Sequence, residues 1–133
     1  MSNITKVVLG KVGMDGHDRG LETLATWLRN SGIEVIHLGR YRTVGEVTMA
    51  AIQEDADVIG LSFLGGEHMY FVSAMIEEMK KKNLNIPFVI GGIIPKKDIP
   101  VLKDMGVNGV FPAGSSMDEI VAEIKRQAIS GAE

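Results

Sequence analysis

A glycine-rich loop with one histidine between two carboxylates is the stretch of this sequence best suited to chemistry. Residues 11–20 read KVGMDGHDRG, so His17 lies between Asp15 and Asp18. Neutral imidazole is a common metal ligand, and a carboxylate that accepts its second ring N–H fixes the tautomer and raises the basicity of the ring. Asp15 is close enough in sequence for that role, and Lys11 could in turn orient Asp15.

One histidine cannot form a closed zinc site, because structural zinc is held by four protein ligands. The chain has no cysteine, which also excludes disulfides and cysteine nucleophiles. A metal at His17 would therefore take its other ligands from an organic cofactor, a condition that favours a haem or a corrin. From spacing alone, an ordinary loop histidine flanked by two turn-forming carboxylates explains the pattern equally well.

The glycines of this loop do not form a familiar phosphate-binding motif. They read Gly13-x-x-Gly16-x-x-x-Gly20, whereas a dinucleotide fingerprint reads G-x-G-x-x-G, and the chain has no Walker A loop. The chain does not fit a response-regulator receiver domain either, although such a domain has the same kind of sheet. Its phosphoacceptor aspartate would end the third strand, where this sequence has Ser62.

Size and composition fit a single globular domain. The chain has 133 residues, 45% of them hydrophobic and 23% charged, so it can bury the core of one domain. Its net charge of −3 provides no basic surface for nucleic acid. No apolar run approaches the ~20 residues of a membrane helix, and the N-terminus lacks the features of a signal peptide. We therefore expect a cytoplasmic protein that binds neither nucleic acid nor membrane.

Short apolar runs alternate with longer amphipathic runs along the chain, which is the pattern of an α/β fold. The expected strands cover residues 4–10, 33–38, 57–62, 88–90 and 107–111. The expected helices cover residues 21–30, 44–55 after a capping box of Thr43 and Glu46, 67–82, 95–105 before Gly106, and a last segment from Ser115 or Ser116 to residue 129. These elements predict a doubly wound, five-stranded parallel sheet of the flavodoxin-like or Rossmann-like kind.

Ligands of such a sheet bind outside the carboxyl ends of its strands. Small or polar residues gather at that edge, in four loops that cover residues 11–20, 62–66, 91–92 and 112–115. Stability alone does not require such loops. The sequence therefore predicts a ligand site at this edge of the sheet.

Three motifs resemble, in the same order, those of cobalamin-binding domains. They are D-x-H-x-x-G at residues 15–20, S-x-L at residues 62–64, and the paired glycines Gly91 and Gly92. The sequence around the first motif is similar to that of methylmalonyl-CoA mutase and other coenzyme B12-dependent acyl-CoA mutases, and the similarity covers about residues 4–128. On this resemblance, residues 1–133 are a single cobalamin-binding domain similar to the small subunit of such a mutase.

The resemblance implies a role for each motif residue. The benzimidazole of the cofactor would leave cobalt, and His17 would become the lower axial ligand, with Asp15 as its hydrogen-bond partner and Lys11 as the third member of the relay. Gly91 and Gly92 would leave room for the benzimidazole, because any Cβ there would intrude on the ring. The other residues expected to bind the cofactor are Gly16, Asp18, Arg19, Gly20, Ser62 and Leu64, with Gly114 and Ser115 meeting its phosphate or ribose through free N–H groups before the last helix.

The resemblance also implies adenosylcobalamin as the cofactor and a large subunit as the partner. In this family the acyl-CoA pocket belongs to a (β/α)8 barrel, so we expect no activity from this chain alone. Met1 lies a few residues before the first strand, which favours a natural small subunit. We expect the partner to contact the rim that includes Arg40, Arg42 and His68. At the start of its helix, His68 could lie near the cofactor, and a position on the helix surface is equally consistent with the sequence.

The alternative function is a corrinoid methyl carrier of a methyltransferase system. Such carriers share the D-x-H-x-x-G motif, but they usually have a helical cap before the sheet, for which this chain has no room. The amino-acid sequence of the loop around His17 favours the acyl-CoA mutase group. The identity of the acyl group does not follow from this sequence, because the barrel selects it.

Overall fold

The computed structural model describes residues 4–11, 19–39, 43–63, 67–112 and 114–132. The strands are β1 Lys6–Gly10, β2 Glu34–His37, β3 Val58–Phe63, β4 Phe88–Gly92 and β5 Gly109–Pro112. The α-helices are α1 Arg19–Asn30, α2 Val44–Gln53, α3 His68–Lys81, α4 Ile99–Met105 and α5 Met117–Ala132, with a 3-10 helix, η1, at Lys96–Asp98. The predicted alternation of strands and helices is therefore confirmed, with ends displaced by a few residues.

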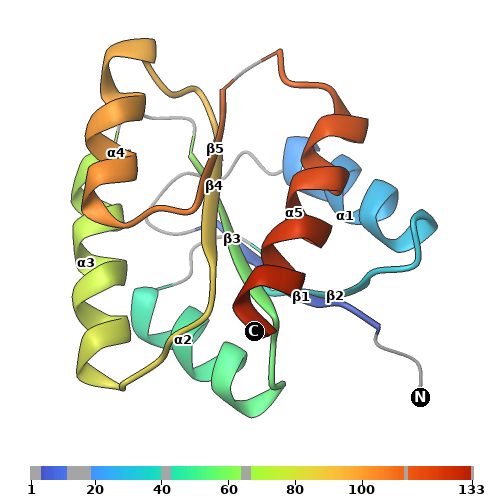
Figure 1. The fold of residues 1–133 in the computed structure, drawn as a ribbon, viewed down its shortest axis with the longest axis horizontal. Coiled ribbons are helices and arrows are strands. Elements are labelled where there is room, and N and C mark those ends of the chain that lie inside the picture. Colours follow the sequence, from blue (N-terminus) through green and yellow to red (C-terminus); the bar gives the residue numbers. More distant parts are fainter. Residues whose placement is uncertain (1–3, 12–18, 40–42, 64–66, 113, 133) are drawn as a thin grey trace.

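The five strands form one parallel sheet in the order β2-β1-β3-β4-β5. Helices α1 and α5 cover one face of the sheet, and α2, α3 and α4 cover the other (Figure 1). The chain leaves β1 toward one edge and returns through β3 toward the other, so the direction of winding switches between β1 and β3. This is the doubly wound sheet that the sequence predicts, and its switch point is the place where such folds bind ligands.

Alternation of side chains along the strands produces two hydrophobic core clusters, one on each face of the sheet. On β3, Ile59 and Leu61 pack under α2 and α3, whereas Val58 packs under α1 and α5. The cluster beneath α1 and α5 also contains Leu28 and Ile124, which are 0% and 1% exposed. No helix in the described ranges is long and apolar enough to cross a membrane.

Local capping signals fix two helix ends as the sequence predicts. The Thr43 hydroxyl accepts a hydrogen bond from the backbone N–H of Glu46 at 3.0 Å, and the Glu46 carboxylate accepts one from the backbone N–H of Thr43 at 3.0 Å. This capping box starts α2. Gly106 ends α4 in the left-handed conformation, with φ of 117°.

The helix expected over residues 95–105 is two elements. A 3-10 turn at Lys96–Asp98 precedes α4, and Pro100 lies in the first turn of α4. A single α-helix over the whole stretch would place the ring of Pro100 against the carbonyl of Lys96, four residues earlier. Starting α4 at Ile99 avoids this clash, because a first-turn residue needs no intrahelical N–H bond.

Candidate functional site

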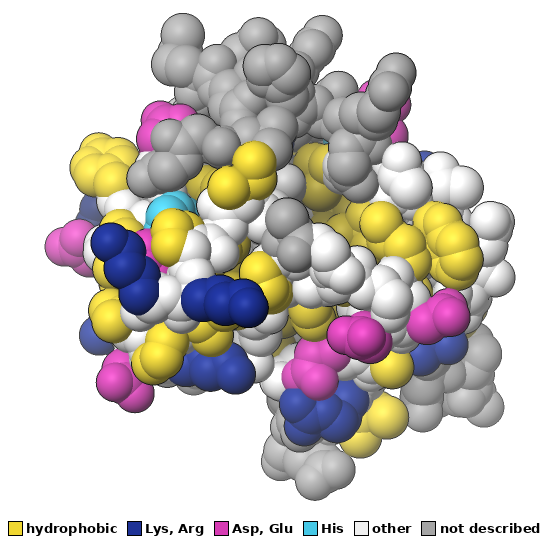
Figure 2. Space-filling view, turned by 90° about the horizontal axis from the view of Figure 1, so that it is seen from above, with side chains coloured by type: hydrophobic (Ala, Val, Ile, Leu, Met, Phe, Trp, Pro, Cys, Tyr) yellow, Lys and Arg dark blue, Asp and Glu magenta, His cyan; other side chains and the backbone are white. Residues whose placement is uncertain are grey.

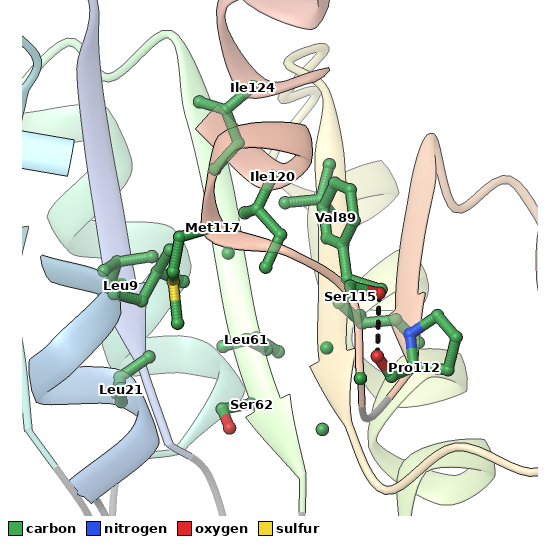
Figure 3. A pocket seen from close by; sticks show the side chains of 17 residues that line it. Leu9, Leu21, Leu61, Ser62, Val89, Pro112, Ser115, Met117, Ile120 and Ile124 are labelled. Carbon is green, nitrogen blue, oxygen red and sulfur yellow. Dashed lines mark hydrogen bonds between the residues drawn. The ribbon is translucent and has the colours of Figure 1, made fainter. Parts of the chain in front are cut away.

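An apolar cavity opens at the switch point of the sheet, between the strands and the helices α1 and α5. It has a volume of about 250 Å³. We call this cavity the slot, and Figure 3 shows the side chains that line it. The lining residues are Leu9, Leu21, Leu24, Gly60, Leu61, Ser62, Val89, Ile90, Gly91, Gly92, Phe111, Pro112, Gly114, Ser115, Met117, Ile120 and Ile124. The slot therefore lies at the edge of the sheet where the sequence predicts a ligand site.

The carboxyl edge of the sheet is the entrance side of this site. Figure 2 looks onto the molecule from that side and shows hydrophobic side chains in and around a hollow near the middle of the surface. In Figure 3, Ser62 and Ser115 lie toward the carboxyl ends of the strands, whereas Ile120 and Ile124 lie toward the amino ends. The slot thus has a hydroxyl-bearing outer part and an apolar inner part.

Glycines in the strands create the floor of the slot. The register places Gly60 between Leu9 and Val89, and it places Gly91 between Ser62 and Phe111. Among the described residues, a Cβ added at Gly91 would contact only Phe111, at 3.3 Å from its carbonyl oxygen and 3.6 Å from its Cβ. The floor of the slot is therefore open at Gly91.

Gly60 is a lining residue that the sequence analysis missed. It lies in the middle of β3, where a Cβ would come within 2.8 Å of the Leu9 side chain. The signal was present, because a glycine inside a buried strand often marks close approach of a ligand or another chain segment. The apolar wall from Met117, Ile120 and Ile124 was also missed as a binding surface, since α5 reads equally well as a core helix.

Gly92 has a structural reason to be glycine that differs from the expected one. Its φ is +116°, and an added Cβ would lie 1.9 Å from the Phe63 carbonyl oxygen. That oxygen accepts a hydrogen bond from the backbone N–H of Ile93 at 2.9 Å, which holds the ends of β3 and β4 together. The protein backbone alone therefore requires glycine at position 92, and the expectation that a Cβ there would intrude on a bound ring stays a prediction.

We expect Gly92→Ala to lower the free energy of unfolding by about 2 kcal/mol or more, because the new Cβ meets both a positive φ and the Phe63 carbonyl. Urea denaturation without any ligand would measure this loss. Gly32→Ala is the matched control, since φ is +86° there but no atom of the described residues lies within 4 Å of the added Cβ. It should cost only about 1 kcal/mol. Equal losses for the two variants would contradict the backbone collision.

The backbone N–H of Ser115 is engaged within the protein, which corrects the expectation of free N–H groups there. Both the N–H and the hydroxyl of Ser115 donate to the carbonyl oxygen of Pro112, at 3.1 and 2.8 Å (Figure 3). Ser116 rather than Ser115 caps α5, since its hydroxyl accepts from the N–H of Glu119 at 3.1 Å. Gly114 has φ of +96°, a conformation that favours glycine, and it lines the slot beside Ser115.

Lys11 is buried at the end of β1, with 1% of its surface exposed. Its backbone N–H donates to the carbonyl oxygen of Gly39 at 3.0 Å, which fixes the start of the following loop. A buried ammonium group requires a hydrogen-bond or ion-pair partner. The burial of Lys11 is thus compatible with the relay role expected for it.

Several of the expected site residues lie outside the described residues. These are Asp15, Gly16, His17, Asp18 and Leu64, together with Arg40 and Arg42 of the expected partner contact. Arg19 and Gly20 form the start of α1. The two attachment points of the segment 12–18 are described, and both adjoin the slot. Leu9 lies two residues before Lys11 and Leu21 two residues after Arg19, and both leucines line the cavity.

His68 is buried rather than on the surface. It is 3% exposed, and its Nε2 lies 2.8 Å from Oδ2 of Asp98. This contact joins the start of α3 to the end of η1. The alternative that places His68 on the helix surface is therefore wrong, and its buried side chain also contradicts the expected partner contact at His68. Within the described ranges, no group of three His, Cys, Asp or Glu side chains is placed to hold a metal ion.

A doubly wound sheet with an apolar, ring-sized slot at its switch point defines a ligand-binding α/β domain. Residues 5–122 match the B12 binding domain family, and the chain belongs to this family. This membership agrees with the resemblance carried by the three motifs.

Three curated relatives are similar to most of this chain. The pivalyl-CoA mutase small subunit of Xanthobacter autotrophicus is 39% identical over 87% of this chain and 78% of its own length. The 2-hydroxyisobutanoyl-CoA mutase small subunit of Aquincola tertiaricarbonis is 36% identical over 90% of this chain and 89% of its length. Ethylmalonyl-CoA mutase of Cereibacter sphaeroides is 38% identical over 90% of this chain, which spans 18% of that longer protein. The chain is therefore related to acyl-CoA mutase small subunits and to B12 domains of mutases.

Solved structures agree on the fold. A cobalamin-binding protein from Desulfitobacterium hafniense superposes with a TM-score of 0.81 at 21% identity, covering 94% of this chain and 60% of that one. The methanol:cobalamin methyltransferase complex MtaBC from Methanosarcina barkeri superposes with a TM-score of 0.70 at 28% identity, covering 88% of this chain and 46% of that one.

Proposed function

We propose that this chain is the cobalamin-binding small subunit of an adenosylcobalamin-dependent acyl-CoA mutase. The observation that carries the proposal is the slot, which opens at the carboxyl edge of the sheet, beside the end of β1 and the start of α1 that precede and follow the segment containing His17. In this proposal His17 is the lower axial ligand of cobalt, and the nucleotide tail of the cofactor enters the slot. The cofactor, when bound, supplies a cobalt–carbon bond whose homolysis starts the rearrangement of an acyl-CoA carbon skeleton.

The residues of the slot fit the benzimidazole end of that tail. A cavity of ~150 Å³ lined by apolar side chains is enough to hold benzene. The slot, at about 250 Å³, is large enough for a two-ring base. Its floor is open at Gly91, where a side chain would otherwise project toward the base. Its hydroxyl groups, from Ser62 and Ser115, lie at the outer end, where the ribose and phosphate of the tail would follow.

Lys11 and Asp15 would together orient His17. Lys11 is buried at the end of β1, so its ammonium group can act only on nearby groups of this edge. In the proposal it pairs with Asp15, and Asp15 accepts the second ring N–H of His17. That arrangement holds the imidazole in one tautomer and increases its basicity toward cobalt. Gly16, Asp18, Arg19, Gly20 and Leu64 complete the proposed site, on the strength of the motif resemblance.

The mutase assignment is supported by the relatives, two of which are themselves named small subunits of acyl-CoA mutases. The proposed partner is a large subunit whose (β/α)8 barrel binds the acyl-CoA. A corrinoid methyl carrier is the second candidate, and the observation that favours it is the likeness to the methyltransferase complex from Methanosarcina barkeri at 28% identity. Transfer of a methyl group from methylated cofactor on this chain to a thiol acceptor in the presence of a methyltransferase would favour the second candidate.

We expect the bound cofactor to have a histidine nitrogen, and not the benzimidazole nitrogen, below cobalt. Electron paramagnetic resonance of cob(II)alamin on the full chain reports that nitrogen directly. Labelling the chain with 15N-histidine should change the hyperfine pattern of the axial nitrogen from that of 14N to that of 15N. His17→Gln in the same labelled background is the control, because His37 and His68 remain and should give no axial signal. A pattern that labelling leaves unchanged would mean that histidine does not bind cobalt.

A further inference from the structure

The described residues of the inner part of the slot offer no side-chain hydrogen-bond partner. Of the described lining residues, the only polar side chains are Ser62 and Ser115, and both lie at the outer end (Figure 3). The inner end is formed by Val89, Ile120 and Ile124, which are 3%, 8% and 1% exposed. A group that enters this end is therefore surrounded by hydrocarbon.

The backbone of these described residues offers no hydrogen-bond partner either. Leu9, Gly60 and Val89 pair in register in the middle of β1, β3 and β4, and Val89 pairs with Gly109 of β5. Their N–H and C=O groups belong to the parallel ladders of the sheet. Ile120 and Ile124 lie within α5, where the backbone groups bond along the helix. A polar atom carried into the inner slot would thus lose its water without replacement.

We propose that the slot selects the lower base of the corrinoid, preferring 5,6-dimethylbenzimidazole to adenine. This inference rests on the proposed function, because it assumes that the tail enters the slot. The two bases share an imidazole ring and differ in the six-membered ring. In dimethylbenzimidazole that ring carries two methyl groups, whereas in adenine it carries two ring nitrogens and an amino group. Each buried methyl improves binding by roughly fourfold. A buried polar group without a partner weakens binding by about 5- to 150-fold.

The test is the affinity of the full chain for three corrinoids with the same upper ligand, by calorimetric titration. They are cobalamin, its adenine counterpart and cobinamide, which has no base. Free corrinoids differ in how firmly their base coordinates cobalt in solution. The selectivity is the Kd for the adenine corrinoid divided by the Kd for cobalamin. We compare this ratio between variants of the chain, because the free ligands are the same in every titration and their difference in base coordination cancels.

Val89→Thr replaces a slot methyl by a hydroxyl of similar size and supplies the missing partner. We expect it to reduce the selectivity for cobalamin over the adenine corrinoid about fivefold or more. Val8→Thr is the matched control, since Val8 is a buried valine of β1 that faces the other core cluster. It should leave the selectivity unchanged. Ile120→Thr, on the opposite wall of the slot, replaces Val89→Thr should the latter not fold.

The possible results distinguish a failure of base selection from a failure of the proposed function. A selectivity that is the same in the unmodified chain, in Val89→Thr and in Ile120→Thr would overturn base selection. If cobalamin still bound more tightly than cobinamide in that case, the slot would hold the tail without discriminating among bases. Equal Kd values for cobalamin and cobinamide in every variant would instead contradict the proposed place of the tail.

Discussion

Gly91→Leu is expected to weaken cobalamin binding roughly 100-fold or more while the protein stays folded. The leucine side chain would project from the slot floor into the space proposed for the base. Burial of a two-ring group removes ~150–250 Å² from water. At about 25 cal/mol per Å², its exclusion would cost at least 3 kcal/mol. Titration of cobalamin into the variant, beside a thermal melt, measures both properties.

The new Cβ at Gly91 would lie 3.3 Å from the Phe111 carbonyl oxygen, a tight contact that requires a shift of a few tenths of an ångström, and we expect the fold to accommodate it. Overpacking of this kind costs typically ~1–3 kcal/mol. Cobinamide is the ligand control, since it has no base and its affinity should change little. Ile59→Leu, on the other face of the sheet, is the protein control. Unchanged cobalamin affinity in folded Gly91→Leu would place the tail elsewhere.

We also expect the isolated chain to give no detectable acyl-CoA mutase turnover with adenosylcobalamin. Radical intermediates require a site from which water is excluded. In the proposed binding mode the cofactor tail would fill the slot, and the rest of the cofactor would lie outside it, over the carboxyl edge of the sheet. This chain would therefore leave the upper face of the cofactor open, and a barrel-bearing subunit would have to cover it.

The assay for this second prediction is acyl-CoA isomerisation with and without a candidate large subunit. The substrates tested are methylmalonyl-, ethylmalonyl-, pivalyl- and 2-hydroxyisobutanoyl-CoA, which match the names of the relatives. Full activity should appear only with the second chain, and His17→Gln in the small subunit should remove it. Robust turnover by the 133-residue chain alone would overturn the two-subunit proposal.

Most of the fold was predictable because its signals are local. Continuous apolar runs gave the strands, and the capping box at Thr43 gave the start of α2. The prediction failed where neighbouring segments decide the outcome. The helix position of His68 left open a surface site or a site near the cofactor, but the structure buries His68 in contact with Asp98, thirty residues away. Gly92 reads as a ligand position, but the Phe63 carbonyl of the adjacent strand already requires a residue without Cβ.

The sequence by itself determined the order of strands and helices, the three family motifs, and the edge of the sheet at which a ligand site lies. Only the tertiary structure decided what the site is made of. Leu21 in α1 and Ile120 in α5 line the same slot, although 99 positions separate them in the chain. Periodicity marks both as apolar helix positions, but it carries no information on which helices become neighbours. Sheet order and register determine that, because they place α1 and α5 on one face and align Gly60 and Gly91 beneath them.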